Sequence, residues 1–221
     1  VGHWKFDETS GTTASDSSGN NNTGTLTNGP TWTTGKIGGA LSVDGVDDNV
    51  PIGSGSSIDN LPVLTISAWI NARSSGSGGF GVIMQKTYGA EISFGGWVFG
   101  FDGSSAPQEI VFSVDYTTTD LRVVSNISSD TDLNAWHHVL VIWDGSSLAS
   151  GVKIYKDGIE TSYTTQTNGV GTRVDDSART GNIGNANTGD ATWNGLLDDI
   201  RTYNRVLTTS DIQALYALGS G

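Results

Sequence analysis

The sequence of 221 residues contains no cysteine, only four prolines, and only 11 lysines and arginines against 23 aspartates and glutamates. The absence of cysteine excludes a disulfide framework, a cysteine-ligated zinc ion and a thiol nucleophile. The longest apolar runs, such as Val139–Trp143, fall far short of the roughly 20 residues that a membrane-spanning helix needs. A net charge of −12 leaves no basic footprint for phosphate groups. We therefore expect no nucleic-acid partner and no membrane insertion.

The residues that are present indicate a folded, β-rich domain. Seven Trp, six Tyr and six Phe favour a packed body over disorder. The sequence shows no alternation of strands and helices, no repeat and no linker, so we expect one antiparallel all-β domain over residues 1–221. Runs of β-branched, aromatic and aliphatic residues between turn residues predict twelve strands: His3–Asp7, Ala40–Asp44, Leu64–Ala72, Val82–Lys86, Glu91–Phe101, Glu109–Tyr116, Leu121–Ile127, Trp136–Trp143, Val152–Lys156, Thr161–Thr165, Arg179–Ile183 and Trp193–Tyr203.

One helix and one hairpin stand out from this pattern. The apolar spacing predicts a helix over Leu207–Leu218. Ser210 is expected to cap it, Gln213 to complete a capping box, and Gly219 to end it. The Asp157-Gly158 pair between two strands predicts a tight hairpin, because such pairs accept the positive φ that the turn requires.

Seven segments carry a family signature when they are taken in order. They are residues 3–8, 16–20, 39–48, 65–70, 136–139, 155–158 and 194–207. Together they resemble the laminin-G-like branch of the concanavalin A-like lectin/glucanase superfamily, over nearly the whole chain. The resemblance implies a jelly-roll sandwich of two curved antiparallel sheets, here with one short C-terminal helix, and often one structural calcium. It implies no single function, because this fold hosts lectins, glucanases, adhesion modules and virion proteins.

These observations favour a binding protein over an enzyme. We interpret the chain as a non-catalytic carbohydrate-binding or adhesion module of a secreted, surface or multidomain protein, with a glycan or polysaccharide as its partner. The alternative is a structural or protein-interaction domain of a virion or cell-surface assembly, since the composition rich in Thr, Asn and Gly is common in such proteins. The third hypothesis is a glycoside hydrolase or lyase.

The acidic residues argue against hydrolysis. Glycosidases place two carboxyl groups about 5–10 Å apart across the scissile bond, and the glucanases that the sequence resembles carry theirs on one strand. Only four glutamates are present, and no two share a predicted strand. Glu109 and Asp115 share strand parity, but six residues separate them by about 20 Å. The sequence leaves open whether carboxylates on neighbouring strands meet.

The same resemblance implies a calcium site. In the glucanases an Asp on the last strand binds calcium together with backbone carbonyls from near the start of the chain, and Asp198 matches that Asp. Asp7 and the Gly45 carbonyl are its expected companions; alternatively, Asp198 pairs with Arg201 or caps a turn. The oxygen-rich segment around Asp16 and Asn20 is a weaker candidate, for which an Asx-rich turn is the favoured interpretation.

Sugar rings stack on exposed aromatic side chains, with polar groups beside them. Trp97, Trp193 and Tyr88 are the candidate ligand-binding residues, because they lie outside the family segments or near Gly-rich loops. Burial in the core is the alternative for each. Strand alternation places Trp69 on the polar face of its strand, opposite Leu64 and Ile66.

Overall fold

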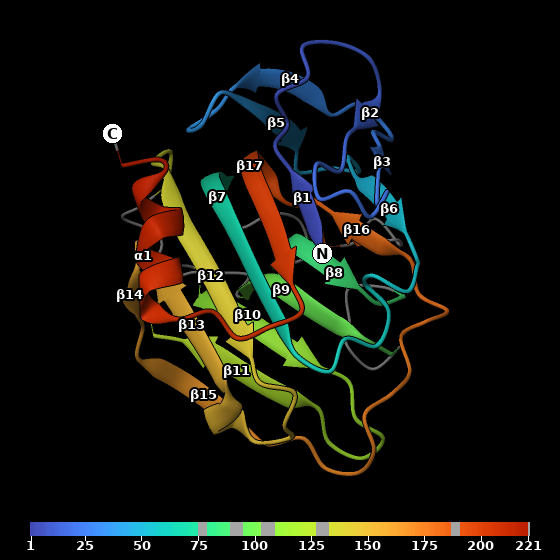
Figure 1. Cartoon of the computed structure of the whole chain (residues 1–221), viewed down its shortest axis with the longest axis vertical. Coiled ribbons are helices and arrows are strands. Elements are labelled where there is room, and N and C mark those ends of the chain that lie inside the picture. Colours follow the sequence, from blue (N-terminus) through green and yellow to red (C-terminus); the bar gives the residue numbers. More distant parts are fainter. Residues whose placement is uncertain (75–78, 89–94, 103–108, 127–132, 187–190, 221) are drawn as a thin grey trace.

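Two antiparallel sheets lie face to face in this computed structural model, which describes residues 1–220 except 75–78, 89–94, 103–108, 127–132 and 187–190 (Figure 1). In spatial order, the eight-stranded sheet consists of β14 (Ile159–Glu160), β13 (Val152–Lys156), β12 (His137–Trp143), β7 (Leu64–Ser74), β17 (Asn194–Tyr203), β5 (Gly39–Asp44) and β4 (Thr31–Thr34), with β1 (Gly2–Trp4) beside β17. The seven-stranded sheet consists of β15 (Tyr163–Thr167), β11 (Leu121–Ser125), β10 (Glu109–Val114), β9 (Trp97–Asp102), β8 (Phe80–Lys86), β16 (Gly181–Ile183) and β6 (Val50–Gly53). A small ribbon joins β2 (Thr13–Ala14) to β3 (Gly24–Thr25), and a short 3-10 helix covers Ala149–Gly151.

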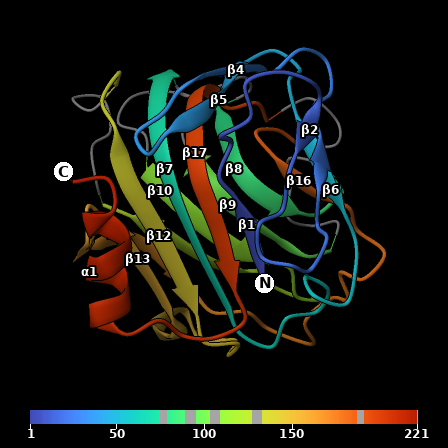
Figure 2. The same ribbon diagram turned by 45° about the horizontal axis from the view of Figure 1, so that its top comes forward.

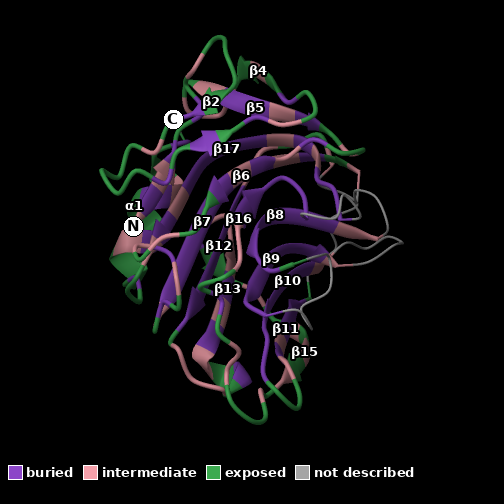
Figure 3. Ribbon diagram, turned by 90° about the vertical axis from the view of Figure 1, so that its right-hand side faces the viewer, coloured by how far each residue is buried: buried purple, intermediate pink, exposed green. Residues whose placement is uncertain are grey.

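The hydrophobic core lies between the two sheets, because alternate residues of each strand point inward. In β7 the inward residues are Leu64, Ile66, Ala68 and Ile70, as the alternation predicts. In β9 the inward residues are Trp97, Phe99 and Phe101. Figure 3 shows the strands of both layers largely buried, with exposed residues concentrated in the turns. The expected all-β sandwich of two antiparallel sheets is confirmed.

The C-terminal helix α1 (Thr209–Ala217) covers the outer face of the eight-stranded sheet beside β12 and β13 (Figure 2). Its Ile212 and Leu215 pack on Leu140 and Ile142 of β12. Thr208, rather than Ser210, caps the helix, and Asp211 completes the capping box in place of Gln213. The predicted cap was two residues late, because Thr208 and Asp211 offer the same reciprocal hydrogen bonds one half-turn earlier.

The helix also buries the polar face of β7. The Trp69 ring stacks on Tyr216 with 5.8 Å between centroids, and His138 lies 5.3 Å from Trp69. The His138 ring shares a 2.8 Å hydrogen bond with the Ser67 hydroxyl, and burial lowers the pKa of His138 to about 4. These side chains therefore hold the helix on the sheet rather than face a ligand.

All twelve predicted strands are present, most with shifted ends. Residues 91–94 of the Glu91–Phe101 strand and Ile127 of the Leu121–Ile127 strand lie outside the described residues. Five strands were missed: β2, β3, β4, β6 and β14. Each has only two to four residues, and most are rich in Thr and Gly, so no hydrophobic alternation marks them. The Asp157-Gly158 hairpin is confirmed, because both residues have positive φ, 51° and 77°, between β13 and β14.

No helix in the described part of the chain has the length and apolar character to cross a membrane.

Candidate functional site

The outer face of the seven-stranded sheet carries a continuous row of side chains. Cross-strand pairing aligns Asn182 of β16, Gln85 of β8, Val98 of β9, Ser113 of β10 and Arg122 of β11. Their neighbours along the strands, such as Met84 and Phe99, point into the core, so this row points away from it. We call these five residues the outer row.

Two amide side chains of the outer row have unsatisfied polar atoms. Gln85 and Asn182 are both fully buried and are direct cross-strand partners. Neither the Nε2 nor the Oε1 of Gln85 has a hydrogen-bond partner among the described residues, nor does the Oδ1 of Asn182. Asn185, just beyond β16, is also buried, and neither its Nδ2 nor its Oδ1 has a hydrogen-bond partner among the described residues. A buried polar group without a partner costs about 1–3 kcal/mol, so these amides hold hydrogen-bonding capacity that the described part of the chain does not use.

A small apolar cluster and one charged pair flank these amides. Val82 and Val98 are fully buried against Ala186 and Ala191 of the segment after β16, and Phe80 packs against them half-buried. Arg122 lies over the Phe80 ring, 6.0 Å from its centroid. The same guanidinium forms an ion pair with Asp102, which projects from the same face of β9. Apolar walls with a few fixed polar groups are typical of small-molecule binding sites.

A hollow of about 540 Å³ lies at one end of this face. The carboxyl groups of Asp115 and Asp120 are hydrogen-bonded neighbours in it. Burial raises the pKa of Asp115 to about 6, and the hydrogen bond and the charge of Asp120 contribute to this rise. Because the two groups touch, they lack the separation that glycoside hydrolysis requires.

Two of the three predicted sugar platforms are wrong. Trp97 and Trp193 are 2% and 0% exposed, and the Trp193 ring packs 4.8 Å from Phe101 in the core. Neither ring offers a face to a ligand, because both lie in the hydrophobic core between the sheets. Tyr88 is 59% exposed, and the Arg179 guanidinium lies 6.0 Å from its ring centroid. Its role in binding remains a prediction.

The three predicted calcium ligands do not lie together. Asp198 is fully buried, and its Oδ2 accepts a 2.7 Å hydrogen bond from the Ile37 amide. Asp7 accepts a 2.8 Å hydrogen bond from the Gly39 amide. The carboxylates of Asp198 and Asp7 therefore both bind backbone amides at the turn between β4 and β5. Gly45 follows the far end of β5, about 20 Å away along the strand, and its carbonyl accepts a hydrogen bond from Thr192. One ion therefore cannot bind all three.

The weaker candidate behaves as an Asx-rich turn. The Asp16 carboxylate accepts hydrogen bonds from the backbone amides of His3, Ser18 and Asn22. Burial raises its pKa, but these bonds outweigh burial and hold the pKa below the ordinary value. Asn20 donates to the Val1 carbonyl. A carboxylate surrounded by N–H donors leaves few lone pairs for a cation.

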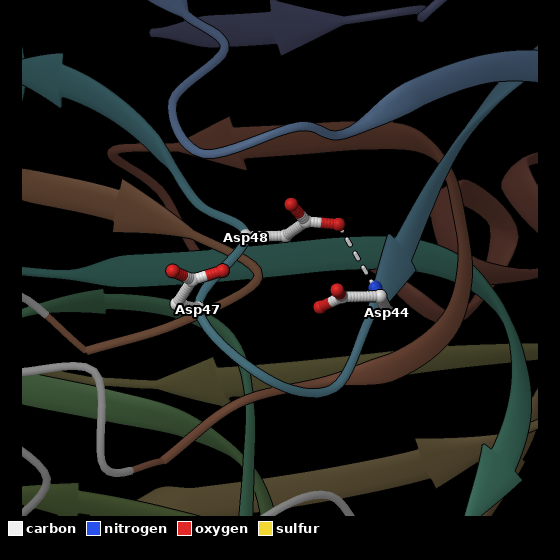
Figure 4. Close-up of side chains that lie close together, drawn as sticks. All are labelled: Asp44, Asp47 and Asp48. Atoms are coloured by element: carbon white, nitrogen blue, oxygen red, sulfur yellow. Dashed lines mark hydrogen bonds between the residues drawn. The ribbon is translucent and has the colours of Figure 1, made fainter.

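Another acidic cluster lies beside Gly45. Asp44, Asp47 and Asp48 each offer a carboxylate oxygen within 4.8 Å of the others, a geometry that could hold a metal ion (Figure 4). Asp48 is 4% exposed and accepts a 2.9 Å hydrogen bond from the Asp44 amide. Burial raises the pKa of Asp48, and the charges of Asp44 and Asp47 add to this effect. Three aspartates within five residues are visible in the sequence, but this spacing was not recognised as a candidate metal site.

The ionisation of Asp198 should be visible in the pH dependence of stability. Burial raises its pKa to about 7, whereas an unfolded Asp has a pKa near 4. Between these values the folded chain binds the extra proton, so the free energy of unfolding decreases as the pH rises from about 4 to 7. In urea titrations, Asp198→Asn should lose less stability than wild type between about pH 5 and pH 8. The control Asp16→Asn, whose carboxyl has a lowered pKa, should keep the wild-type slope; equal slopes for Asp198→Asn and wild type would contradict the assignment.

Comparisons with known proteins show the family to which the chain belongs. Residues 44–213 match the sequence model of the concanavalin A-like lectin/glucanases superfamily, laminin G type, and the chain belongs to this family. No curated protein matches significantly. Among solved structures, the chain is similar to domain 4 of AbnA, a GH43 extracellular arabinanase from Geobacillus stearothermophilus, in complex with arabinotriose. The identity is 21%, with 97% of each chain covered and a TM-score of 0.62.

The chain is also similar to toxin binding domains. The binding domain of Paraclostridial Mosquitocidal Protein 1 matches at 15% identity and TM-score 0.69, with 98% of this chain and 51% of that chain covered. The binding domain of Botulinum neurotoxin DC, in complex with rat synaptotagmin II, matches at 16% identity and TM-score 0.62, with coverage of 100% and 51%. The chain spans about half the length of these toxin domains. At these identities the likeness concerns the fold.

Proposed function

We propose that the chain is a non-catalytic carbohydrate-binding module of an extracellular protein, and that it binds a neutral oligosaccharide on the outer row. The observation that carries the proposal is a pair of buried cross-strand amides: Gln85 has no partner at either polar atom, and Asn182 has none at its Oδ1. Amide groups both donate and accept, which suits sugar hydroxyls, and the half-buried Phe80 ring suits the C–H face of a sugar ring. Because both amides are fully buried, the ligand must open the outer row to reach them.

The charges at the site favour a neutral ligand. Arg122 is neutralised by Asp102, so it offers no free positive charge to an acidic sugar. At the end of the face Asp115 and Asp120 outnumber Arg179 and would repel a carboxylate, and the chain carries a net charge of −12. Arabinotriose, the ligand in the complex of the similar AbnA domain, is neutral and is the first probe to use.

Calorimetric titration tests the proposal. Wild type should bind arabinotriose or another neutral oligosaccharide, and Asn182→Ala should weaken that binding at least about tenfold, since one buried hydrogen-bonding group is lost. The exposed Asn28, near the Asp44–Asp48 turn, provides the matched control, and Asn28→Ala should bind as wild type does. Equal affinities for wild type and Asn182→Ala would overturn the site, and no binding across a neutral glycan panel would overturn the function.

Hydrolysis is the competing function that one observation favours. Glu109 and Asp102 are direct cross-strand partners on the outer face, which brings two carboxylates to neighbouring strands. However, Asp102 is held in an ion pair by Arg122. We expect no turnover of arabinan, β-glucans or agarose above a heat-inactivated control, as reducing ends would report. Product formation that Glu109→Gln abolishes would instead establish a glycosidase.

We also propose that the Asp44, Asp47 and Asp48 cluster takes calcium as a structural ion. Its support is the closeness of three carboxylates, one of them buried, because calcium prefers such oxygen ligands. Calcium at a hundredfold excess over its dissociation constant should add about 2.7 kcal/mol to the free energy of unfolding. The melting temperature should therefore rise with calcium and fall with chelator. Asp48→Asn should abolish this response and Asp198→Asn should keep it; the opposite result would move the ion to Asp198.

A further inference from the structure

A second open hollow lies at the opposite end of the sandwich from β14, along the edge strand β4. Its volume is about 540 Å³. It is formed where the segment after β1 crosses the β4–β5 hairpin, and all of its lining residues are described: Asp7, Glu8, Thr9, Trp32, Thr33, Thr34, Gly38 and Gly39. The size is within the range of small-ligand sites, about 300–1,000 Å³.

The aromatic part of this hollow is Trp32, which is half-buried. Its indole Nε1 donates a 2.9 Å hydrogen bond to the Gly11 carbonyl, and Phe6 packs 6.4 Å from it between ring centroids. These contacts fix the orientation of the ring before any ligand arrives. An indole ring in the lining can attract both sugar C–H groups and cations.

The acidic part is Asp7 and Glu8. One oxygen of each is already held: Asp7 Oδ1 by the Gly39 amide and Glu8 Oε1 by the Ser15 amide, both at 2.8 Å. The other oxygen of Glu8, Oε2, is buried and has no partner in the described part of the chain. None of the residues that line the hollow is basic. The partly buried Glu8 carboxylate therefore has no positively charged side chain opposite it in the lining.

The backbone around the carboxylates is unusually constrained. Phe6 has a φ of 57°, a left-handed conformation that bulky residues rarely adopt. Gly38 has a φ of 73°, and a Cβ there would clash with Asp7 Oδ1. The chain therefore requires a strained Phe6 and a glycine at 38 to bring Asp7 against the hairpin, which is typical of built sites.

We propose that this hollow binds a saccharide unit that carries a protonated amine. The ammonium group would donate hydrogen bonds to the Glu8 and Asp7 carboxylates, and charge-assisted bonds of this kind are stronger than neutral ones. The ring would contact Trp32, and the Thr9, Thr33 and Thr34 hydroxyls would lie near its hydroxyl groups. The site lies on another sheet from the outer row, so this proposal does not depend on the proposed function.

The probes are the glucosamine trimer and its fully N-acetylated form, which differ in the charge of the amine. By calorimetry at about pH 6, the glucosamine trimer should bind wild type at least about tenfold more tightly than the acetylated trimer. Added salt should weaken that binding, because exposed charges are screened. Glu8→Gln, which keeps the shape and the Ser15 acceptor, should weaken it at least about tenfold, and so should Trp32→Ala.

Glu160→Gln is the matched control, because this substitution removes the same charge as Glu8→Gln does. Glu160 is exposed and lies on β14, at the opposite edge of the sheet from the hollow. It should bind the glucosamine trimer as wild type does. The proposal is overturned if the glucosamine trimer does not bind, if both trimers bind equally, or if Glu160→Gln weakens binding as much as Glu8→Gln does. Trp32→Ala is judged only if its melting temperature stays near that of wild type; Glu8→Gln decides the question in either case.

Discussion

Replacing Gln85 by Met should weaken oligosaccharide binding and, at the same time, stabilise the unliganded protein. Gln85 is fully buried in β8, and neither of its amide atoms has a partner among the described residues. Methionine has a similar unbranched shape without the unsatisfied polar atoms, so we expect the free energy of unfolding to rise by about 1 kcal/mol. Loss of the amide should reduce affinity for the neutral oligosaccharide at least about tenfold. Urea denaturation and calorimetry on the same preparation measure both effects.

Gln166→Met is the matched control for this experiment. Gln166 is exposed on the edge strand β15 of the same sheet, so the same substitution there removes no buried amide. It should change neither stability nor affinity measurably. If Gln85→Met were destabilising and bound the oligosaccharide normally, Gln85 would be a structural residue. The proposed site would then lose the side chain expected to bind the sugar.

Trp193→Ala should be among the most destabilising single substitutions in the chain. The Trp193 side chain is fully buried and packs tilted against Phe101. Large-to-small changes of buried Trp cost about 3–5 kcal/mol, because the lost transfer free energy and the cavity add. Trp97→Ala, at 2% exposure, should cost nearly as much.

Trp136→Ala provides the comparison, since Trp136 is only half-buried, just before β12. Its cost in urea denaturation should be clearly smaller than that of Trp193→Ala. If Trp193→Ala lost little stability but abolished sugar binding, the ring would be an accessible platform after all.

The fold was largely predictable from the sequence, because strand alternation reports local geometry directly. The four inward residues of β7 and the outward Trp69 follow from alternation alone. Alternation also groups Trp97 with Phe99 and Phe101. It does not tell which of two faces is the core, and this is why Trp97 was wrongly expected to meet a ligand.

The site was less predictable, because it depends on pairing between strands far apart in the chain. Gln85 interrupts the apolar run Val82–Met84, a visible signal, but its meaning requires the neighbour Asn182, 97 positions away. Asp198 was correctly placed near Asp7, since both reach the β4–β5 turn. It was not recognisable from the sequence that the Ile37 and Gly39 amides bind these carboxylates.

The most direct test of the binding site is NMR of the side-chain amide groups during titration with arabinotriose or the best-binding neutral oligosaccharide. We predict that the side-chain NH₂ signals of Gln85 shift the most, because this group gains a hydrogen-bond partner. Those of Asn182 should shift as well, because its free Oδ1 accepts from the sugar while its Nδ2 keeps the bond to the Thr180 carbonyl. The NH₂ signals of Asn20 and Asn28, which already donate to backbone carbonyls away from the outer row, should stay in place. Saturable binding that leaves Gln85 and Asn182 unshifted would contradict the account.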